Sequence, residues 1–295
     1  MKQKYWFIFS IVLVIASLLR LPFLDTFPPG GQNALFMRIP SAIAGVISIG
    51  LFMLIVKKRS NDNVFSYVSG LVLTFMPWHI EQSRVYSQAM LGLTVVLAGT
   101  VLYHVFQKRT WQIICIIITC VVFRFSCPSF WFFSGTQVLP TAYGFVNNLF
   151  KLVSVEFLFF KNDSFWWGGL RTVGAMLVST LPFFIIGIYE AVLKNKRNVW
   201  KWMLFMLSIW FVAAANPQFP EEREFFFITP FLSLILGFGV KKVIEQFAYP
   251  KIWIKALLSI YIIWLVYDHV VFIHWYTTHY PLRVRSEIPY EKRNF

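Results

Sequence analysis

Long apolar runs recur along the whole chain with only short breaks between them, and this pattern limits the fold more than any other feature. Each run approaches the roughly 20 apolar residues that a helix needs to cross a bilayer. The chain has 295 residues, of which 58% are hydrophobic, and its mean hydropathy is +0.63. We therefore predict an all-α polytopic transmembrane bundle of about nine spans, over residues 5–23, 40–56, 64–80, 86–106, 111–133, 172–193, 199–215, 225–243 and 252–275.

No long soluble segment interrupts these runs. We expect one bundle domain over residues 1–276, followed by a polar, basic tail over residues 277–295. The bias of lysine and arginine toward alternate breaks predicts a cytoplasmic N-terminus, and an odd number of spans then places the C-terminus outside. The expected location is the cytoplasmic (plasma) membrane, and the basic cytoplasmic breaks carry Lys57, Lys58, Arg59, Lys108, Arg109, Lys194, Lys196, Arg197, Lys241 and Lys242.

The formal net charge of +14 does not indicate a nucleic-acid-binding protein. Nucleic-acid binding needs basic residues on one shared face, whereas these residues form small clusters between apolar runs, as topology signals do. The chain also lacks a phosphate-binding loop and a dinucleotide-binding glycine motif. Cys115, Cys120 and Cys127 have no metal-ligand spacing and are interpreted as packing residues. We expect no nucleic-acid partner for the chain and no metal site at these cysteines.

The first external loop follows a segment that combines Asp25 with the turn Pro28-Pro29-Gly30. Proline cannot continue a helix and glycine favours turns, so the chain must bend here. A carboxylate at the edge of a membrane span is costly and is usually paired or functional. Asp25 is therefore a candidate catalytic base, and a simple turn or cap carboxylate is the alternative.

A second external segment, Met76–Arg84, carries His79, Glu81 and Arg84 close together. The planar guanidinium group of arginine can bind two phosphate oxygens at once. The segment thus has the side chains of an anion-binding site. The alternative is an interfacial loop that Trp78 anchors at the membrane surface.

Two further external segments are rich in charged and aromatic residues. Residues 155–164, which include Asp163, are typical of a helix that lies in the membrane interface. Residues 216–225 place Arg223 among three glutamates. That arginine either binds an anionic lipid head group or belongs to the solvated start of a helix, where acids favour the first turn.

Five segments occur in the order typical of one family of membrane enzymes. Residues 38–45 read RIPSAIAG and are similar to that family's RLPSALAG, while residues 76–84 read MPWHIEQSR and are similar to its SPWHIxxSR. The other three are residues 19–30, 156–183 and 223–230. On these segments the chain resembles the GT-C glycosyltransferases of family 39 and the aminoarabinose-transferase-like group, which is protein-mannosyltransferase-like.

The resemblance implies a GT-C-like fold and a reaction at the outer face of the membrane. Such enzymes transfer a sugar from a polyprenyl-phosphate donor to a protein, lipid or glycan acceptor. Carried over, Arg84 and Arg223 hold the donor phosphate, while His79 and Asp163 support the external loops. The resemblance leaves the cofactor undetermined, with a divalent cation as one option. The full set of implied substrate-binding residues is Arg38, His79, Glu81, Arg84, Asp163 and Arg223.

The first external loop departs from the family's pattern, because the Asp-Glu pair that usually follows Pro28-Pro29-Gly30 is absent. Asp25 is then the acid left to act as the base, provided that it reaches the acceptor hydroxyl. A catalytically degenerate relative, which binds a lipid-linked sugar or serves as a partner subunit, is the first alternative to an enzyme. A transporter or flippase fits less well, since the sequence has no inverted repeat of broken helices.

Overall fold

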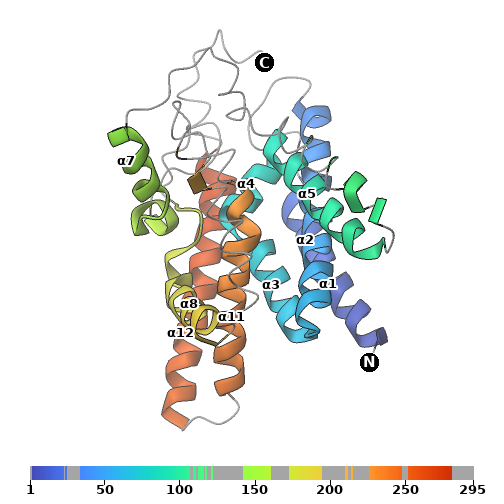
Figure 1. The fold of residues 1–295 in the computed structure, drawn as a ribbon. Helices are drawn as coiled ribbons and strands as arrows, with labels where there is room; N and C mark the ends of the chain where they lie inside the picture. Colours follow the sequence, from blue (N-terminus) through green and yellow to red (C-terminus); the bar gives the residue numbers. More distant parts are fainter. Residues whose placement is uncertain are drawn as a thin grey trace.

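The computed structural model describes residues 2–22, 24, 34–106, 109–110, 112–115, 117, 121, 142–160, 173–194, 210–211, 214, 226–247 and 252–280. Within these ranges every regular element is a helix (Figure 1), which confirms the all-α prediction. The elements are α1 (Lys2–Arg20), α2 (Ala34–Ser60), α3 (Asn63–Phe75), α4 (Pro77–Arg84), α5 (Gln88–Val105), α7 (Ala142–Leu152), the π-helix η2 (Glu156–Phe160), the 3-10 helix η3 (Val178–Thr180), α8 (Leu181–Lys194), the 3-10 helix η4 (Phe226–Ile228), α11 (Thr229–Phe247), α12 (Ile252–His274) and the π-helix η5 (Trp275–His279).

Four described segments are long and apolar enough to cross a membrane, namely Leu35–Ser60, Gln88–Val105, Phe226–Gln246 and Ile252–His279. They indicate a membrane protein, as the sequence predicts. The apolar helices α3 and α8 have only 13 and 14 residues. They extend about 20 Å, which is short of the roughly 30 Å hydrocarbon core. The predicted runs 111–133 and 199–215 lie largely outside the described residues, so the nine spans stay a prediction.

The predicted run over residues 64–80 is divided into two helices. α3 ends at Phe75 and α4 begins at Pro77, with Met76 extended between them at φ −65° and ψ 121°. Proline disfavours helical backbone in the residue before it, yet it suits the first turn of a new helix. The break therefore gives His79 and the polar residues that follow it a helix of their own.

Helix α11 packs between α3 and α8, and glycines let the backbones approach closely (Figure 1). A Cβ atom at Gly239 would lie 1.9 Å from the Phe183 carbonyl oxygen of α8, and one at Gly237 would lie 2.3 Å from the Ser69 hydroxyl of α3. Ser233 adds a hydrogen bond to α3 by donating to the Ser69 carbonyl oxygen at 2.7 Å. Small residues at helix crossings are typical of membrane bundles, and these contacts join α11 to both α3 and α8.

Helix α12 is attached to the bundle along a single stripe. Its less exposed side chains include Leu258, Tyr261, Leu265, Asp268 and Phe272, which are spaced three or four residues apart. Two of them bind the backbone of Ser179. Asp268 Oδ2 accepts a hydrogen bond from the amide at 3.2 Å, and the Tyr261 hydroxyl donates to the carbonyl oxygen. The opposite face carries exposed apolar residues such as Ile260 and Ile263, as a lipid-facing helix requires.

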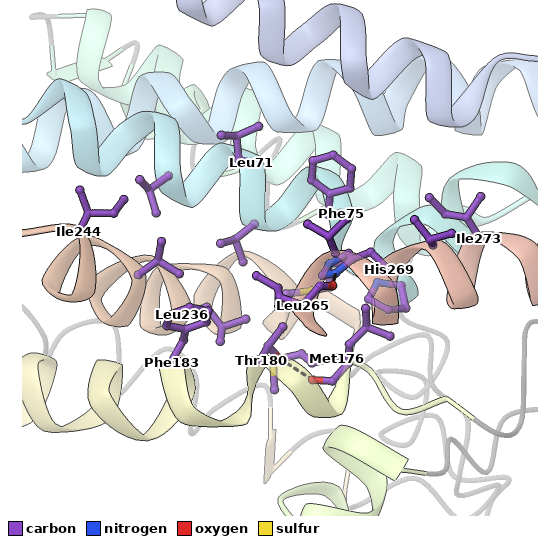
Figure 2. A pocket seen from close by; sticks show the side chains of 18 residues that line it. Leu71, Phe75, Met176, Thr180, Phe183, Leu236, Ile244, Leu265, His269 and Ile273 are labelled. Carbon is purple, nitrogen blue, oxygen red and sulfur yellow. Dashed lines mark hydrogen bonds between the residues drawn. The ribbon is translucent and has the colours of Figure 1, made fainter. Parts of the chain in front are cut away.

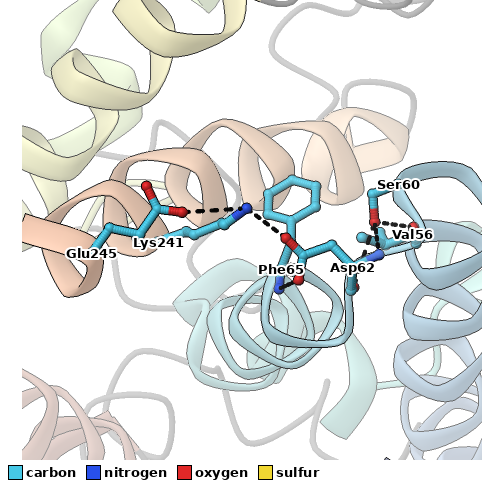
Figure 3. A network of polar contacts seen from close by, with 6 residues as sticks. All are labelled: Val56, Ser60, Asp62, Phe65, Lys241 and Glu245. Carbon is cyan, nitrogen blue, oxygen red and sulfur yellow. Dashed lines mark hydrogen bonds and ion pairs between the residues drawn. The ribbon is translucent and has the colours of Figure 1, made fainter.

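The bundle end that the topology prediction places in the cytoplasm is linked by partly exposed ion pairs (Figure 3). Asp62 precedes α3, and its Oδ1 accepts the Phe65 amide at 3.1 Å, which caps the helix. Its Oδ2 accepts a hydrogen bond from Lys241 of α11, whose ammonium group also lies 3.5 Å from Glu245. Exposed ion pairs contribute little to stability, so apolar packing provides most of the contact between α3 and α11.

Candidate functional site

The described part of the candidate site is buried at one end of the bundle. Arg38 on α2 is 7% exposed, while His79, Glu81 and Arg84 on α4 are 0%, 4% and 6% exposed. The site therefore combines residues of α2 and α4, and it lies beside the C-terminal end of α1, to which Arg84 donates hydrogen bonds. The candidate residues outside the described part of the chain are Asp25, Asp163 and Arg223.

Arg20, the last residue of α1, is a fully buried cation at the centre of a hydrogen-bond chain. Its Nη2 donates to the Thr74 carbonyl oxygen at 3.0 Å and to His79 Nδ1 at 2.9 Å. Because Nδ1 accepts, the hydrogen of the neutral imidazole lies on Nε2, which donates to Ser48 Oγ at 3.0 Å. Ser48 in turn donates to the Gly45 carbonyl oxygen at 2.8 Å. One directed chain of hydrogen bonds thus joins α1, α2, α3 and α4.

The imidazole of His79 has a structural role in this chain. Burial and then the neighbouring Arg20 guanidinium lower the pKa of His79 well below its usual value. A neutral ring whose two nitrogens are both engaged does not take up a proton near neutral pH. His79 therefore positions the guanidinium group of Arg20 and connects it to α2.

Arg84 and Arg38 bind the backbone at the end of α1. Arg84 donates to the carbonyl oxygens of Leu19 at 3.0 Å and Pro22 at 2.9 Å, and Arg38 donates to that of Leu24 at 3.0 Å. The last carbonyl groups of a helix have no helical partners, and cations complement its negative end. Burial lowers the pKa of Arg84, but an arginine side chain keeps its charge. Arg38 and Arg84, which the resemblance assigns to substrate, thus also fix the chain beyond α1.

Glu81 lies close to two tyrosines that the sequence analysis missed. The rings of Tyr276 and Tyr280 stack with centroids 5.6 Å apart and 16° between their planes, and both side chains are buried. Both phenols interact electrostatically with Glu81 and Arg38. Burial raises the pKa of Tyr280 well above its usual value, and Tyr276 and Glu81 add to this shift. Tyr280 is therefore a protonated phenol that can donate a hydrogen bond.

The missed residues gave a weak signal in the sequence. Tyr276 and Tyr280 are four residues apart at the end of an apolar run, which is one turn of a helix, but the tail was expected to begin at residue 277. Helical structure continues through η5 to His279 and carries Tyr280 to the site. Arg20 finds its partners 54 and 59 positions further along the chain, and such long-range pairs leave no local pattern.

The arrangement brings a carboxylate, two guanidinium groups and two phenols to one end of the bundle. Guanidinium groups bind phosphate oxygens, and a carboxylate can take a proton from a nearby hydroxyl. The set can therefore bind an anion and hold a hydroxyl beside it. Across the residues that the structure describes, no group of three or more histidine, cysteine, aspartate or glutamate side chains could hold a metal ion.

Comparisons with known proteins add no relative to this picture. No family model matches the chain, and neither the curated proteins nor the solved structures include a match. The chemistry of the site therefore follows from its residues and their geometry.

Proposed function

We propose that the chain is a membrane glycosyltransferase with a GT-C-like fold. It takes a sugar from a polyprenyl-phosphate-linked donor and transfers it to an acceptor outside the cytoplasmic membrane. The observation that carries the proposal is the convergence of Arg38, Glu81 and Arg84 with Tyr276 and Tyr280. These residues come from α2, α4 and the helical segment that follows α12, so packing brings them together.

The residue types suit the requirements of glycosyl transfer. The acceptor oxygen attacks the anomeric carbon while the bond from that carbon to the phosphate oxygen breaks, and polyprenyl phosphate leaves with the electron pair. A carboxylate takes the acceptor's proton, and positive groups stabilise the phosphate as it leaves. In this proposal Asp25 is the base, Glu81 orients the acceptor hydroxyl, and Arg38, Arg84 and Arg223 bind the donor phosphate.

A second candidate is favoured by the hydrogen bonds of the two described arginines. Arg38 and Arg84 donate to backbone carbonyl oxygens at 2.9–3.0 Å, so part of each guanidinium group stabilises the chain rather than a ligand. A catalytically degenerate relative would keep these hydrogen bonds. It would bind a lipid-linked sugar, or serve as a partner subunit, without turnover.

Turnover by the purified, membrane-reconstituted protein separates the two candidates. The assay supplies a panel of labelled polyprenyl-phosphate sugars with an acceptor extract and measures the release of polyprenyl phosphate. We expect Asp25→Asn to lower the rate by at least about 100-fold, which is the typical contribution of a general base. Glu81→Gln should lower the rate less and should raise the acceptor concentration that is needed for half-maximal rate.

Glu245→Gln is the matched control, because this acid is 52% exposed at the other end of the bundle, and its turnover should equal that of the natural protein. Binding of a donor without turnover across the whole panel would contradict the enzyme and favour the degenerate relative. Unchanged rates in Asp25→Asn would remove that residue from the role of base.

A further inference from the structure

A groove opens between α12 and the rest of the bundle (Figure 2). Its walls come from α3, α11, α12 and the segment from Met176 into α8, and its volume is about 490 Å³. The lining side chains are aliphatic, aromatic or thioether groups, apart from Thr180 and His269. Such walls suit a hydrocarbon, whereas a sugar or a nucleotide would leave its polar groups without partners.

Two of the helices that line the groove, α11 and α12, are long and apolar enough to cross the bilayer. Along α11 the lining runs from Leu236 to Ile244, and along α12 it runs from Leu265 to Ile273. Each stretch is about 12 Å of helix axis, well within a hydrocarbon core of roughly 30 Å. The groove is therefore placed where the hydrocarbon chain of a bilayer lipid can reach it.

His269 provides a polar atom in this apolar wall. Its Nδ1 lies 2.8 Å from the Leu265 carbonyl oxygen. A carbonyl oxygen can only accept, so Nδ1 carries the hydrogen, and Nε2 of the neutral ring is an acceptor. The ring also packs edge-to-face against Phe75, with centroids 5.8 Å apart and 90° between the planes. These two contacts fix the ring and thus the direction of Nε2.

The Nε2 atom of His269 is available to a ligand. In the described part of the chain no hydrogen bond engages this atom. It is also not fully buried, because it is not among the buried polar atoms that lack a partner. The nearby polar groups are engaged elsewhere. Thr180 donates to the Leu177 carbonyl oxygen at 2.6 Å, and Asp268 accepts from the Ser179 amide at 3.2 Å. The groove therefore offers an acceptor that needs a donor from its occupant.

We propose that the groove binds the hydrocarbon chain of a lipid that carries a hydroxyl group, and that this hydroxyl donates to His269 Nε2. A plain hydrocarbon would fill the walls but would leave the acceptor without a donor. A charged group would meet no opposite charge on the lining side chains. The chain of a polyprenyl-phosphate donor carries no hydroxyl, so this site is separate from that of the proposed transferase and does not depend on it.

Two probes that share a hydrocarbon chain and differ in whether the oxygen carries a hydrogen or a methyl group test the proposal. Binding of 1-hexadecanol and of its methyl ether to the purified full-length protein is measured by native mass spectrometry. We expect the alcohol to bind about tenfold more tightly, which corresponds to one buried hydrogen bond. His269→Phe keeps a ring against Phe75 and removes the acceptor, so it should abolish the preference. His274→Phe, on the exposed face of the same helix, should retain it.

A second pair of variants tests the groove itself. Val270 lines the groove but is 58% exposed at its edge, so Val270→Trp should fill the space without disturbing the core and should weaken binding of both probes. Ile263→Trp, on the lipid-facing side of α12, is the control and should leave binding unchanged. Melting temperatures identify any variant that fails to fold, in which case the other pair decides.

Several results would overturn the proposal. Equal affinity for alcohol and ether in the natural protein would show that no hydrogen bond forms. A preference that survives in His269→Phe would place the acceptor elsewhere, and unchanged binding in Val270→Trp would place the lipid outside the groove. Stronger binding of palmitate than of the alcohol at neutral pH would show that the site selects an anion.

Discussion

The two ends of the bundle hold their charges in different ways. At the α4 end, Arg20 is fully buried and donates to a carbonyl oxygen and to a neutral imidazole. At the other end, Asp62 and Lys241 form a pair of opposite charges whose side chains are 28% and 30% exposed. Leaving a buried donor without an acceptor is costly because water is not available, whereas an exposed pair can exchange its partner for water.

This difference predicts that the α4 end is much more sensitive to substitution. Removing one member of a buried polar network leaves the others without partners, and that cost falls on the folded state alone. At the exposed end the side chains are solvated whether or not they pair. We therefore expect changes in the free energy of unfolding to be large around Arg20, intermediate at Arg84 and small at Asp62.

The largest effect is expected for Arg20→Met, which keeps an unbranched apolar stem but removes the guanidinium group and its donors. The Thr74 carbonyl oxygen and His79 Nδ1 would lose their donor, and the free energy of unfolding should fall by about 3 kcal/mol. Denaturation of the purified protein in mixed micelles measures this change. The control is Lys58→Met, an exposed lysine, which should behave as the natural protein does.

An equal or higher stability of Arg20→Met would reverse the comparison. It would mean that the cost of burying the guanidinium charge exceeds the gain from its hydrogen bonds, as occurs for some buried charges. The chain from Arg20 through His79 to Ser48 would then serve a purpose other than stability.

An intermediate effect is expected for Arg84→Lys. The guanidinium group reaches the carbonyl oxygens of both Leu19 and Pro22, and the compact ammonium group of lysine cannot reproduce this fork. The free energy of unfolding should fall by about 1–2 kcal/mol, as measured by the same denaturation. Arg59→Lys, at the exposed end of α2, is the matched control. Similar stability in the two variants would show that the charge alone suffices.

The smallest effect is expected at Asp62 and depends on pH. Burial opposes its ionisation, but the hydrogen bond from Lys241 and that from the Phe65 amide lower the pKa of Asp62 below the usual value of 3.8. A depressed pKa gives stability that is present above the unfolded-state pKa and is lost as the pH falls toward the folded-state pKa. About 0.5 kcal/mol should disappear between about pH 5 and pH 3.

Asp62→Asn should lose this pH dependence, because its amide does not titrate, and a stability profile of both proteins across that range provides the test. If the free energy of unfolding changes with pH equally in the natural protein and in Asp62→Asn, the pair with Lys241 contributes nothing. The ends of the bundle would then differ even more than the structure suggests.

Sequence alone predicts the helical elements well. The runs at residues 40–56, 86–106, 225–243 and 252–275 overlap α2, α5, α11 and α12, because the hydrophobic pattern and the helical hydrogen bonds are both local. The break at Met76 was not predicted because the apolar run continues through Met76 and Pro77. Pro77 could have indicated it. Four candidate site residues are buried together, but their contacts with the end of α1 were not predicted.

The sequence by itself determined that this chain forms apolar helices and that polar residues gather in a few segments between them. Tertiary structure alone decided which polar groups meet. Arg20 donates a hydrogen bond to His79, and Glu81 acts electrostatically on Tyr276 and Tyr280, across long stretches of sequence. The physical reason is that helix formation satisfies hydrogen bonds within a few residues, whereas a buried side chain must find its partner on whichever helix packs against it.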